Sequence, residues 1–256
     1  MLDCLYNSPM QKRLHTYLIP CLIFALSLLS PRVGWASQSP PLAILSPGDG
    51  SVVTSPIMLT AEFQPEVKGM LRLALVDRSG HEIARKLLDV DTTNPLKTAH
   101  FVTELPFEIP TDEGIGLLTL TTLDSSHRPV ALRSVTLNLQ SGGETRLQPQ
   151  TPTGFWLTVT RPQPLETIQG RNFLVEGIVT PQTANPILFE LITDRNRVIG
   201  SSQLAVENPG QTLNFSLRLY YDFVDTSTIA RLVVRQTLEP YDVPAILDSL
   251  LIYLIP

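Results

Sequence analysis

The chain has 256 residues, which is enough for two domains of about 100 to 150 residues each. Its net charge is −5, and the sequence contains no basic run that could follow a phosphate backbone. Composition and charge therefore argue against a nucleic-acid-binding protein, and we expect no nucleic acid among its partners.

The first 36 residues have the order of a secretory signal peptide. Lys12 and Arg13 precede an apolar run from Tyr17 to Leu29, and the small residue Ala36 follows. The run is shorter than the roughly 20 residues that a membrane-spanning helix needs. We expect cleavage after Ala36 and an exported protein that is periplasmic, on the cell surface or secreted. A retained leader that anchors the chain to the membrane is the alternative, because the flanking charge suits both outcomes.

Both cysteines, Cys4 and Cys21, lie within this leader. The mature chain is therefore expected to contain no thiol and to form no disulfide. An exported protein without disulfides is held together by apolar burial, which suits domains of about 100 residues better than miniature scaffolds.

After Pro41 the sequence alternates between apolar and polar residues, without a helical period. Segments 71–76, 135–140 and 215–220 show the period of two most clearly. Such strands bury one face and expose the other, as in antiparallel sandwiches. The pattern predicts an all-β fold.

Residues 141–154 lack apolar periodicity and are rich in Gly, Pro, Gln and Thr, which predicts a linker. This linker separates a predicted β-sandwich over residues 41–140 from a second one over residues 155–256. Trp156 is expected to lie next to the linker and to pack against the start of the second sandwich.

The two predicted domains repeat one another with a shift of roughly 115 residues. The apolar segment Leu71–Val76 followed by Asp77–Gly80 corresponds to Ile187–Ile192 followed by Thr193–Asn196. In both copies an apolar strand leads into a turn where Asp or Asn can hydrogen-bond the local backbone. The pattern indicates two copies of one domain.

The opening of the first domain, Leu45–Pro56 followed by Leu59–Phe63, resembles bacterial immunoglobulin-like domains, especially the type found in spore-germination proteins. The resemblance covers Leu42–Gln140 and extends more faintly over Phe155–Leu254, where Arg161–Leu165 replaces the glycine-rich turn. It implies two tandem immunoglobulin-like antiparallel β-sandwiches behind an N-terminal signal peptide. Such proteins are extracytoplasmic and usually serve interaction or spacing, and the family offers no catalytic residues to carry over.

The sequence contains no convincing metal site. Three histidines follow the leader, and their spacing does not match that of metal ligands: His81, His100 and His127. Asp91 and Asn94, with the nearby Asp89, supply oxygen atoms at close spacing, but the turn glycine and distal glutamate of a calcium loop are missing. We expect a solvated loop there, with a calcium site as the alternative.

Acid–base chemistry also lacks a clear candidate. Asp112 and Glu113 are expected to form a hairpin tip, because adjacent turn residues are seldom separated and desolvated as an acid–base pair requires. Catalysis would need carboxylates such as Asp112, Asp222 and Asp242 to converge from distant loops. We therefore predict no enzyme, no cofactor and no metal.

The densest aromatic and acidic group is the candidate binding site: Tyr220, Tyr221 and Asp222, with Tyr241 in a later loop. Aromatic faces beside carboxylates bind sugars or peptides. A strand end that places alternate rings in the core would give the same pattern. We predict a non-catalytic cell-envelope protein that acts as an interaction, scaffold or spacer module for a protein or envelope polymer. A carbohydrate-binding accessory module that uses these aromatic residues is the alternative.

Overall fold

A computed structural model describes residues 42–63, 69–90, 99–150, 156–222, 224–241 and 243–256. The predicted signal peptide lies outside these residues, as do Asp91 and Asn94 of the possible calcium loop and residues 151–154 of the predicted linker. Residues Ser39–Pro256 form one compact unit. Every regular element within the described residues is a β-strand, as the alternating pattern predicts.

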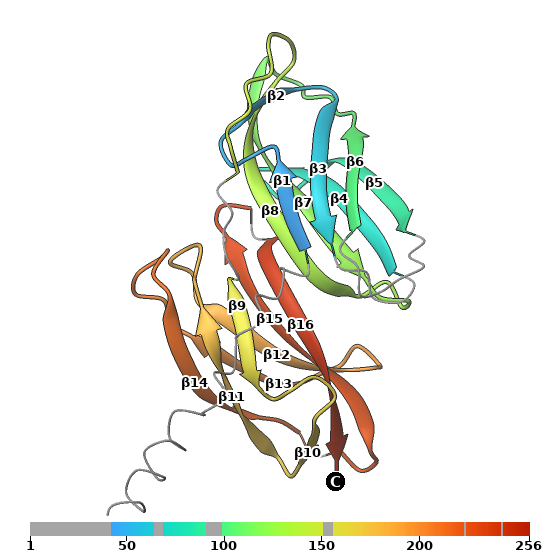
Figure 1. The fold of residues 1–256 in the computed structure, drawn as a ribbon, viewed down its shortest axis with the longest axis vertical. Helices are drawn as coiled ribbons and strands as arrows, with labels where there is room; N and C mark the ends of the chain where they lie inside the picture. Colours follow the sequence, from blue (N-terminus) through green and yellow to red (C-terminus); the bar gives the residue numbers. More distant parts are fainter. Residues whose placement is uncertain (1–41, 64–68, 91–98, 151–155, 223, 242) are drawn as a thin grey trace, which may run out of the picture. The chain divides into compact units, whose positions relative to one another are not determined.

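The N-terminal half consists of two facing sheets. Its described strands are β1 (Leu42–Ser46), β2 (Val52–Thr54), β3 (Ile57–Phe63), β4 (Gly69–Asp77), β5 (Glu82–Val90), β6 (Ala99–Leu105), β7 (Glu113–Leu123) and β8 (Pro129–Gln140). One sheet has the order β1-β3-β6, and the other has the order β8-β7-β4-β5 (Figure 1). Strand β2 pairs in parallel with the end of β8.

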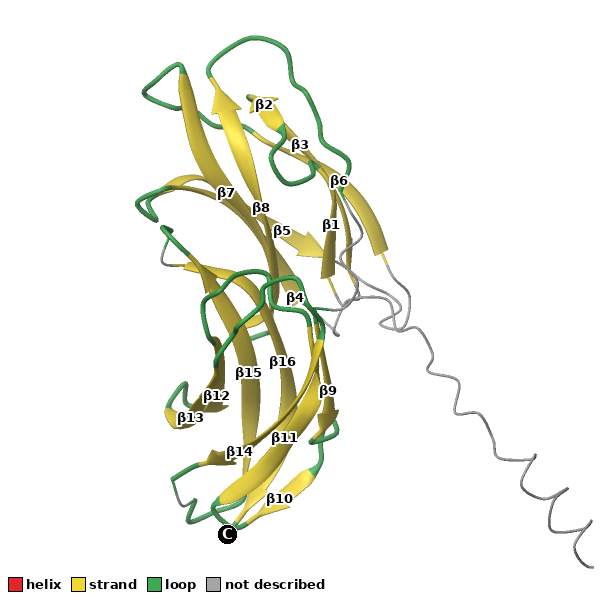
Figure 2. Ribbon diagram, turned by 90° about the vertical axis from the view of Figure 1, so that its left-hand side faces the viewer, coloured by secondary structure: helices red, strands yellow, loops and turns green. Residues whose placement is uncertain are grey.

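The C-terminal half has the same strand order. Its described strands are β9 (Leu157–Arg161), β10 (Thr167–Gln169), β11 (Asn172–Val179), β12 (Ile187–Thr193), β13 (Val198–Leu204), β14 (Leu213–Tyr220), β15 (Thr228–Leu238) and β16 (Val243–Ile255). Sheet β14-β11-β9 faces strands β13-β12-β15-β16 (Figure 2), and β10 pairs in parallel with β16. The strand order of the first half thus recurs here, in an all-β fold of the immunoglobulin-like type.

The strand starts show the internal repeat directly. Strands β1 and β2 begin at Leu42 and Val52, and β9 and β10 begin 115 residues later, at Leu157 and Thr167. The polar turn after β4 also behaves as predicted, because the Asp77 carboxylate accepts hydrogen bonds from the backbone of Ser79 and His81. The order of strands therefore repeats, while the predicted domain boundaries stay predictions.

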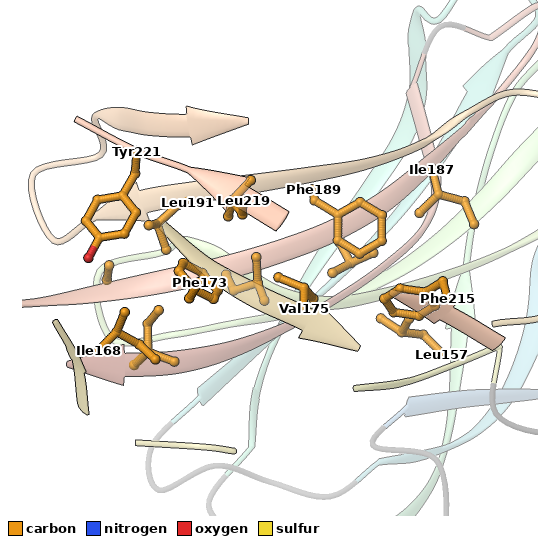
Figure 3. Packing of buried hydrophobic residues seen from close by; sticks show 14 of the residues in the cluster. Leu157, Ile168, Phe173, Val175, Ile187, Phe189, Leu191, Phe215, Leu219 and Tyr221 are labelled. Carbon is orange, nitrogen blue, oxygen red and sulfur yellow. The ribbon is translucent and has the colours of Figure 1, made fainter. Parts of the chain in front are cut away.

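Each half has its own apolar core. In the first, the alternate leucines of β4, Leu71, Leu73 and Leu75, point inward and are buried. In the second, Phe189 and Phe215 pack with ring centroids 5.4 Å apart, close to Val175 (Figure 3). Burying one such side chain contributes about 1.5–3 kcal/mol. Trp156, directly before β9, is only 2% exposed and belongs to the second core, which confirms its predicted position.

The prediction of a hairpin tip at Asp112 and Glu113 is wrong. Glu113 is the first residue of β7 and pairs with Gln140 of β8, whereas the preceding strand β6 belongs to the opposite sheet. A connection between strands of different sheets cannot be a hairpin. The Asp112 carbonyl accepts a hydrogen bond from the backbone of Ser141, 3.0 Å away.

Part of the predicted linker lies against the N-terminal half. Arg146 and Val52 exchange two backbone hydrogen bonds, of 2.8 and 2.9 Å. The Gln148 carbonyl accepts another from Gly48, where a Cβ atom would lie only 2.5 Å from that oxygen. This part of the linker is therefore held in place, and the close approach requires glycine at position 48.

Candidate functional site

The two halves meet through equivalent strands. Strands β8 and β16 run antiparallel and pair at Leu132 and Leu247. The combined strand order, β13-β12-β15-β16-β8-β7-β4-β5, therefore places equivalent strands at equal distances from this point. Leu132 and Leu247 are also equivalent residues of the repeat. The junction consequently has an approximate two-fold axis at this pair, as in a symmetric dimer.

Reciprocal side-chain hydrogen bonds support this symmetry. Ser134 Oγ donates to the Ala245 carbonyl at 2.7 Å, and Ser249 Oγ donates to the Val130 carbonyl at 2.8 Å. A shift of one repeat converts the first bond into the second. Such reciprocity is the mark of an interface in which the same surface of each half is used.

A mostly buried ion pair lies beside the axis. Arg133 Nη2 lies 2.9 Å from Asp248 Oδ2, and the Trp156 indole donates a hydrogen bond to the same oxygen. Burial raises the pKa of Asp248, although Arg133 and Trp156 act in the opposite direction. This carboxylate therefore connects the N-terminal half, the start of β9 and the C-terminal half.

One end of the junction is apolar. Tyr241, in the turn between β15 and β16, is 3% exposed and packs against Val76 and Leu117 of the N-terminal half. Burial raises the pKa of Tyr241, while the Arg78 guanidinium acts to lower it. At Gly80, which has φ +78°, a Cβ atom would lie 2.8 Å from the Tyr241 carbonyl oxygen. Glycine there permits both the left-handed backbone and the close approach.

The other end is charged. Asp124, in the turn between β7 and β8, accepts hydrogen bonds from the backbone of Ser126 and Arg128. Its Oδ2 atom also accepts hydrogen bonds from the guanidiniums of Arg128, at 2.9 Å, and Arg231, at 3.2 Å. Burial alone would raise the pKa of Asp124, but the hydrogen bonds from Arg128 and Ser126 hold it below its usual value. Arg128 also donates to the Asp194 carbonyl, so this turn is joined to the C-terminal half at two points.

A pocket of about 160 Å³ lies at the charged end. Its lining comes from both halves: Arg128, Pro129, Glu190, Ile192, Asn196, Arg231, Val233, Arg235 and Leu247. On the outer face of β15, Val233 lies between Arg231 and Arg235, and it pairs with Glu190 of β12. Glu190 binds Arg235 through two hydrogen bonds of 2.8 and 3.3 Å. The pocket thus has an apolar base with three guanidiniums and one carboxylate around it.

Strand register identifies the equivalent positions in the N-terminal half. Arg231 pairs with Leu251 of β16, and Leu117 pairs with Thr136 of β8. Because Thr136 precedes Leu251 by one repeat, Leu117 is the equivalent of Arg231. On the same face of β7, Thr119 is the equivalent of Val233, and Thr121 is the equivalent of Arg235. Uncharged residues therefore line the end that Tyr241 fills, and arginines line the end that contains the pocket.

The predicted binding residues do not form one site. Tyr220 is 64% exposed at the end of β14, whereas Tyr221 is buried against Phe173, with ring centroids 5.9 Å apart. Asp222 is exposed and forms an ion pair with Arg197 at 2.8 Å. Tyr241 lies at the junction instead. Ligand binding by this group stays a prediction, and the rings of Tyr221 and Tyr241 serve packing.

The sequence contains a weak signal for the pocket. Arg231 and Arg235 alternate with apolar Val233 along a strand, which places charge on its outer face. Nothing in the pattern indicates that the other half covers this face. Within the described residues, no three His, Cys, Asp or Glu side chains gather as a metal site would require, and no helix is long and apolar enough to cross a membrane.

Comparisons with known proteins leave the chain without an assigned family. No family model matches it, and no curated protein matches its sequence. Among solved structures, the fibronectin(III)-like modules of Clostridium thermocellum CbhA share 13% identity at a TM-score of 0.25, over 84% of this chain and 93% of theirs. The periplasmic chaperone SfaE shares 8% identity at a TM-score of 0.27, over 82% and 98%. We draw no functional conclusion from these similarities, and membership of the spore-germination type stays a prediction.

Proposed function

We propose that the chain is an exported, non-catalytic module of the cell envelope, which holds two immunoglobulin-like sandwiches as one docked unit and binds a protein or envelope polymer. The observation that supports this function is the reciprocal junction around Leu132 and Leu247. A scaffold or spacer must keep its binding surfaces at a fixed separation. Pairing between β8 and β16 provides that constraint.

Domains joined by a flexible segment usually move relative to one another, unless their interface is large and apolar. Here Tyr241 adds an apolar contact at one end, and Leu132, Val233 and Leu247 add a second beside the axis. The Arg133–Asp248 pair adds a directional contact between the halves. These contacts together favour a single docked arrangement.

The docked unit can be tested with Leu132→Asp, which places a charge at the centre of the junction. We expect small-angle scattering of the exported chain to show one compact particle, and of the variant to show an extended one. Val102→Asp is the matched control, because Val102 is exposed on β6 and lies in the other sheet of its half. An extended wild-type particle would contradict docking.

The interaction role is tested with the same proteins as baits in an envelope extract. We expect the wild-type chain and Val102→Asp to recover a common partner, and Leu132→Asp to lose it. Recovery of no partner by any bait would contradict an interaction role. Equal recovery by all three would show that the partner does not need the docked unit.

The carbohydrate-binding alternative now depends on Tyr220, whose ring is exposed beside the Arg218–Asn172 hydrogen bond of 2.8 Å. If this face binds a glycan, Tyr220→Ala should remove the signal on a glycan array while the fold stays intact. Tyr253→Ala is the control, because Tyr253 is a partly exposed tyrosine on β16.

A further inference from the structure

We propose that the pocket at the charged end of the junction binds a carboxylate carried on a short apolar body, such as one acidic residue or chain terminus of a partner. Arg235 would hold the carboxylate, Arg128 would add its positive charge beside it, and Val233 and Leu247 would contact the apolar body. This inference deepens the proposed function and rests on it, because the pocket is formed by both halves.

The first argument comes from the two ends of the junction. At the apolar end, Tyr241 packs over Leu117 and Val76. The corresponding turn between β7 and β8 is one residue longer, and its middle residues, 125–127, are exposed. None of these three residues lines the pocket, so none of them fills the space that the Tyr241 ring fills at the other end. The pocket is therefore the place where an external group can do what Tyr241 does internally.

The second argument comes from charge. Three guanidiniums surround the pocket, but only Glu190 among the lining residues is acidic, and Asp124 behind it is shared by Arg128 and Arg231. The equivalent face of the N-terminal half docks with leucine and threonine instead of arginine. Arg231 and Arg128 take part in docking through Asp124 and Asp194. The described hydrogen bonds of Arg235 go to Glu190 of its own half, so docking does not account for this arginine, whereas recognition of an anion does.

The Arg235 guanidinium can donate hydrogen bonds to a ligand. Its hydrogen bonds to Glu190 use Nε and Nη2, and within the described residues Nη1 has no partner. The side chain is 28% exposed, so an incoming group can reach it. The planar guanidinium suits a carboxylate, and pairing with Arg235 offsets the repulsion that Glu190 would otherwise exert.

The size of the pocket limits the ligand. Sites for drug-sized molecules usually enclose about 300–1,000 Å³, and this pocket encloses about 160 Å³. It therefore suits one residue or one terminal group of a larger partner. Its base, formed by Val233 and Leu247, favours an aliphatic or aromatic body next to the carboxylate.

The test uses N-acetyl-leucine and its uncharged amide, N-acetyl-leucinamide, as a matched pair of probes. Titration of the isotope-labelled exported chain, followed by NMR, should show saturable shifts for residues 190–196 and 231–235 with the acid only. Arg235→Gln should weaken binding of the acid at least about tenfold. Arg218→Gln is the control, because Arg218 is an exposed arginine on β14 of the same half.

Glu190→Gln is a second variant, which tests the same site if Arg235→Gln does not fold. It removes the competing carboxylate, so it should tighten binding of the acid several-fold, an effect that a purely structural ion pair would not produce. Equal binding of acid and amide would overturn the proposal, as would unchanged affinity in both variants. Small-angle scattering of the same samples reports docking. A docked chain that does not bind the acid overturns the pocket alone, whereas an undocked chain overturns the proposed function.

Discussion

The two ends of the junction share a backbone and differ in chemistry. At one end a tyrosine at the tip of the β15–β16 hairpin is buried against the N-terminal half. At the other end, the tip of the equivalent β7–β8 hairpin bonds the C-terminal half through Asp124 and Arg128. The strand order that repeats in each half fixes where the hairpins reach. The strand order does not fix which side chains the hairpins carry. One end of the junction is therefore filled by Tyr241, and the other contains the pocket.

The largest expected effect is at the apolar end. Tyr241→Ala should lower the free energy of unfolding by about 3 kcal/mol, because it leaves a cavity between Val76 and Leu117. In the corresponding turn between β7 and β8, Ser126→Ala should alter stability by less than about 0.5 kcal/mol, because Ser126 is exposed and bonds Asp124 only through its backbone. Chemical denaturation of both variants measures the difference. Similar losses would show that the two ends are not as different as their packing indicates.

The two junction carboxylates should respond to pH in opposite ways. The pKa of Asp248 is raised in the folded chain, so its stabilising contribution is present below the unfolded value near 3.8 and is lost as pH rises through the folded pKa. The pKa of Asp124 is lowered, so its contribution is present above 3.8 and is lost as pH falls through the folded pKa. The slope for one titrating group is at most about 1.4 kcal/mol per pH unit.

These slopes can be isolated by comparing the wild-type chain with Asp248→Asn and Asp124→Asn. The stability advantage of the wild type over Asp248→Asn should shrink as pH rises above 3.8. Its advantage over Asp124→Asn should shrink as pH falls below that value. Denaturant titrations across this pH range measure both, and slopes of the same sign would contradict the assignment.

The sequence predicts the cores well and the junction poorly. Alternation in 71–76 and 215–220 predicts inward leucines and phenylalanines, because a strand with one buried face must follow a period of two. Tyr241 and Ser134 carry no such signal. A tyrosine in a turn looks like a surface aromatic, and a serine on an outer face looks solvated. Their burial depends on strand pairing between the halves, which no local pattern encodes.

The candidate site shows the same limit. Tyr220 and Tyr221 are adjacent, so the sequence brings them together, but alternation sends one ring outward and the other into the core. Arg231 and Arg235 reach the pocket because they share the outer face of β15, which the N-terminal half partly covers. Only the pairing of Leu132 with Leu247 shows which half supplies that cover.

The smallest expected effect is at the centre, where the symmetry is closest. Ser134→Ala removes one hydrogen bond to a carbonyl of the other half and should cost about 1 kcal/mol. Ser249→Ala removes the equivalent bond and also the one that Ser249 Oγ accepts from Arg231 Nη1 at 3.0 Å. Because a hydrogen bond from a charged group contributes about 1.5–3 kcal/mol, Ser249→Ala should cost more than Ser134→Ala. Denaturation of the single variants and of the double variant tests this. Equal losses would mean that the Arg231–Ser249 bond contributes nothing to stability, so that the energy of the contacts follows the symmetry of the backbone even where one half has an additional bond.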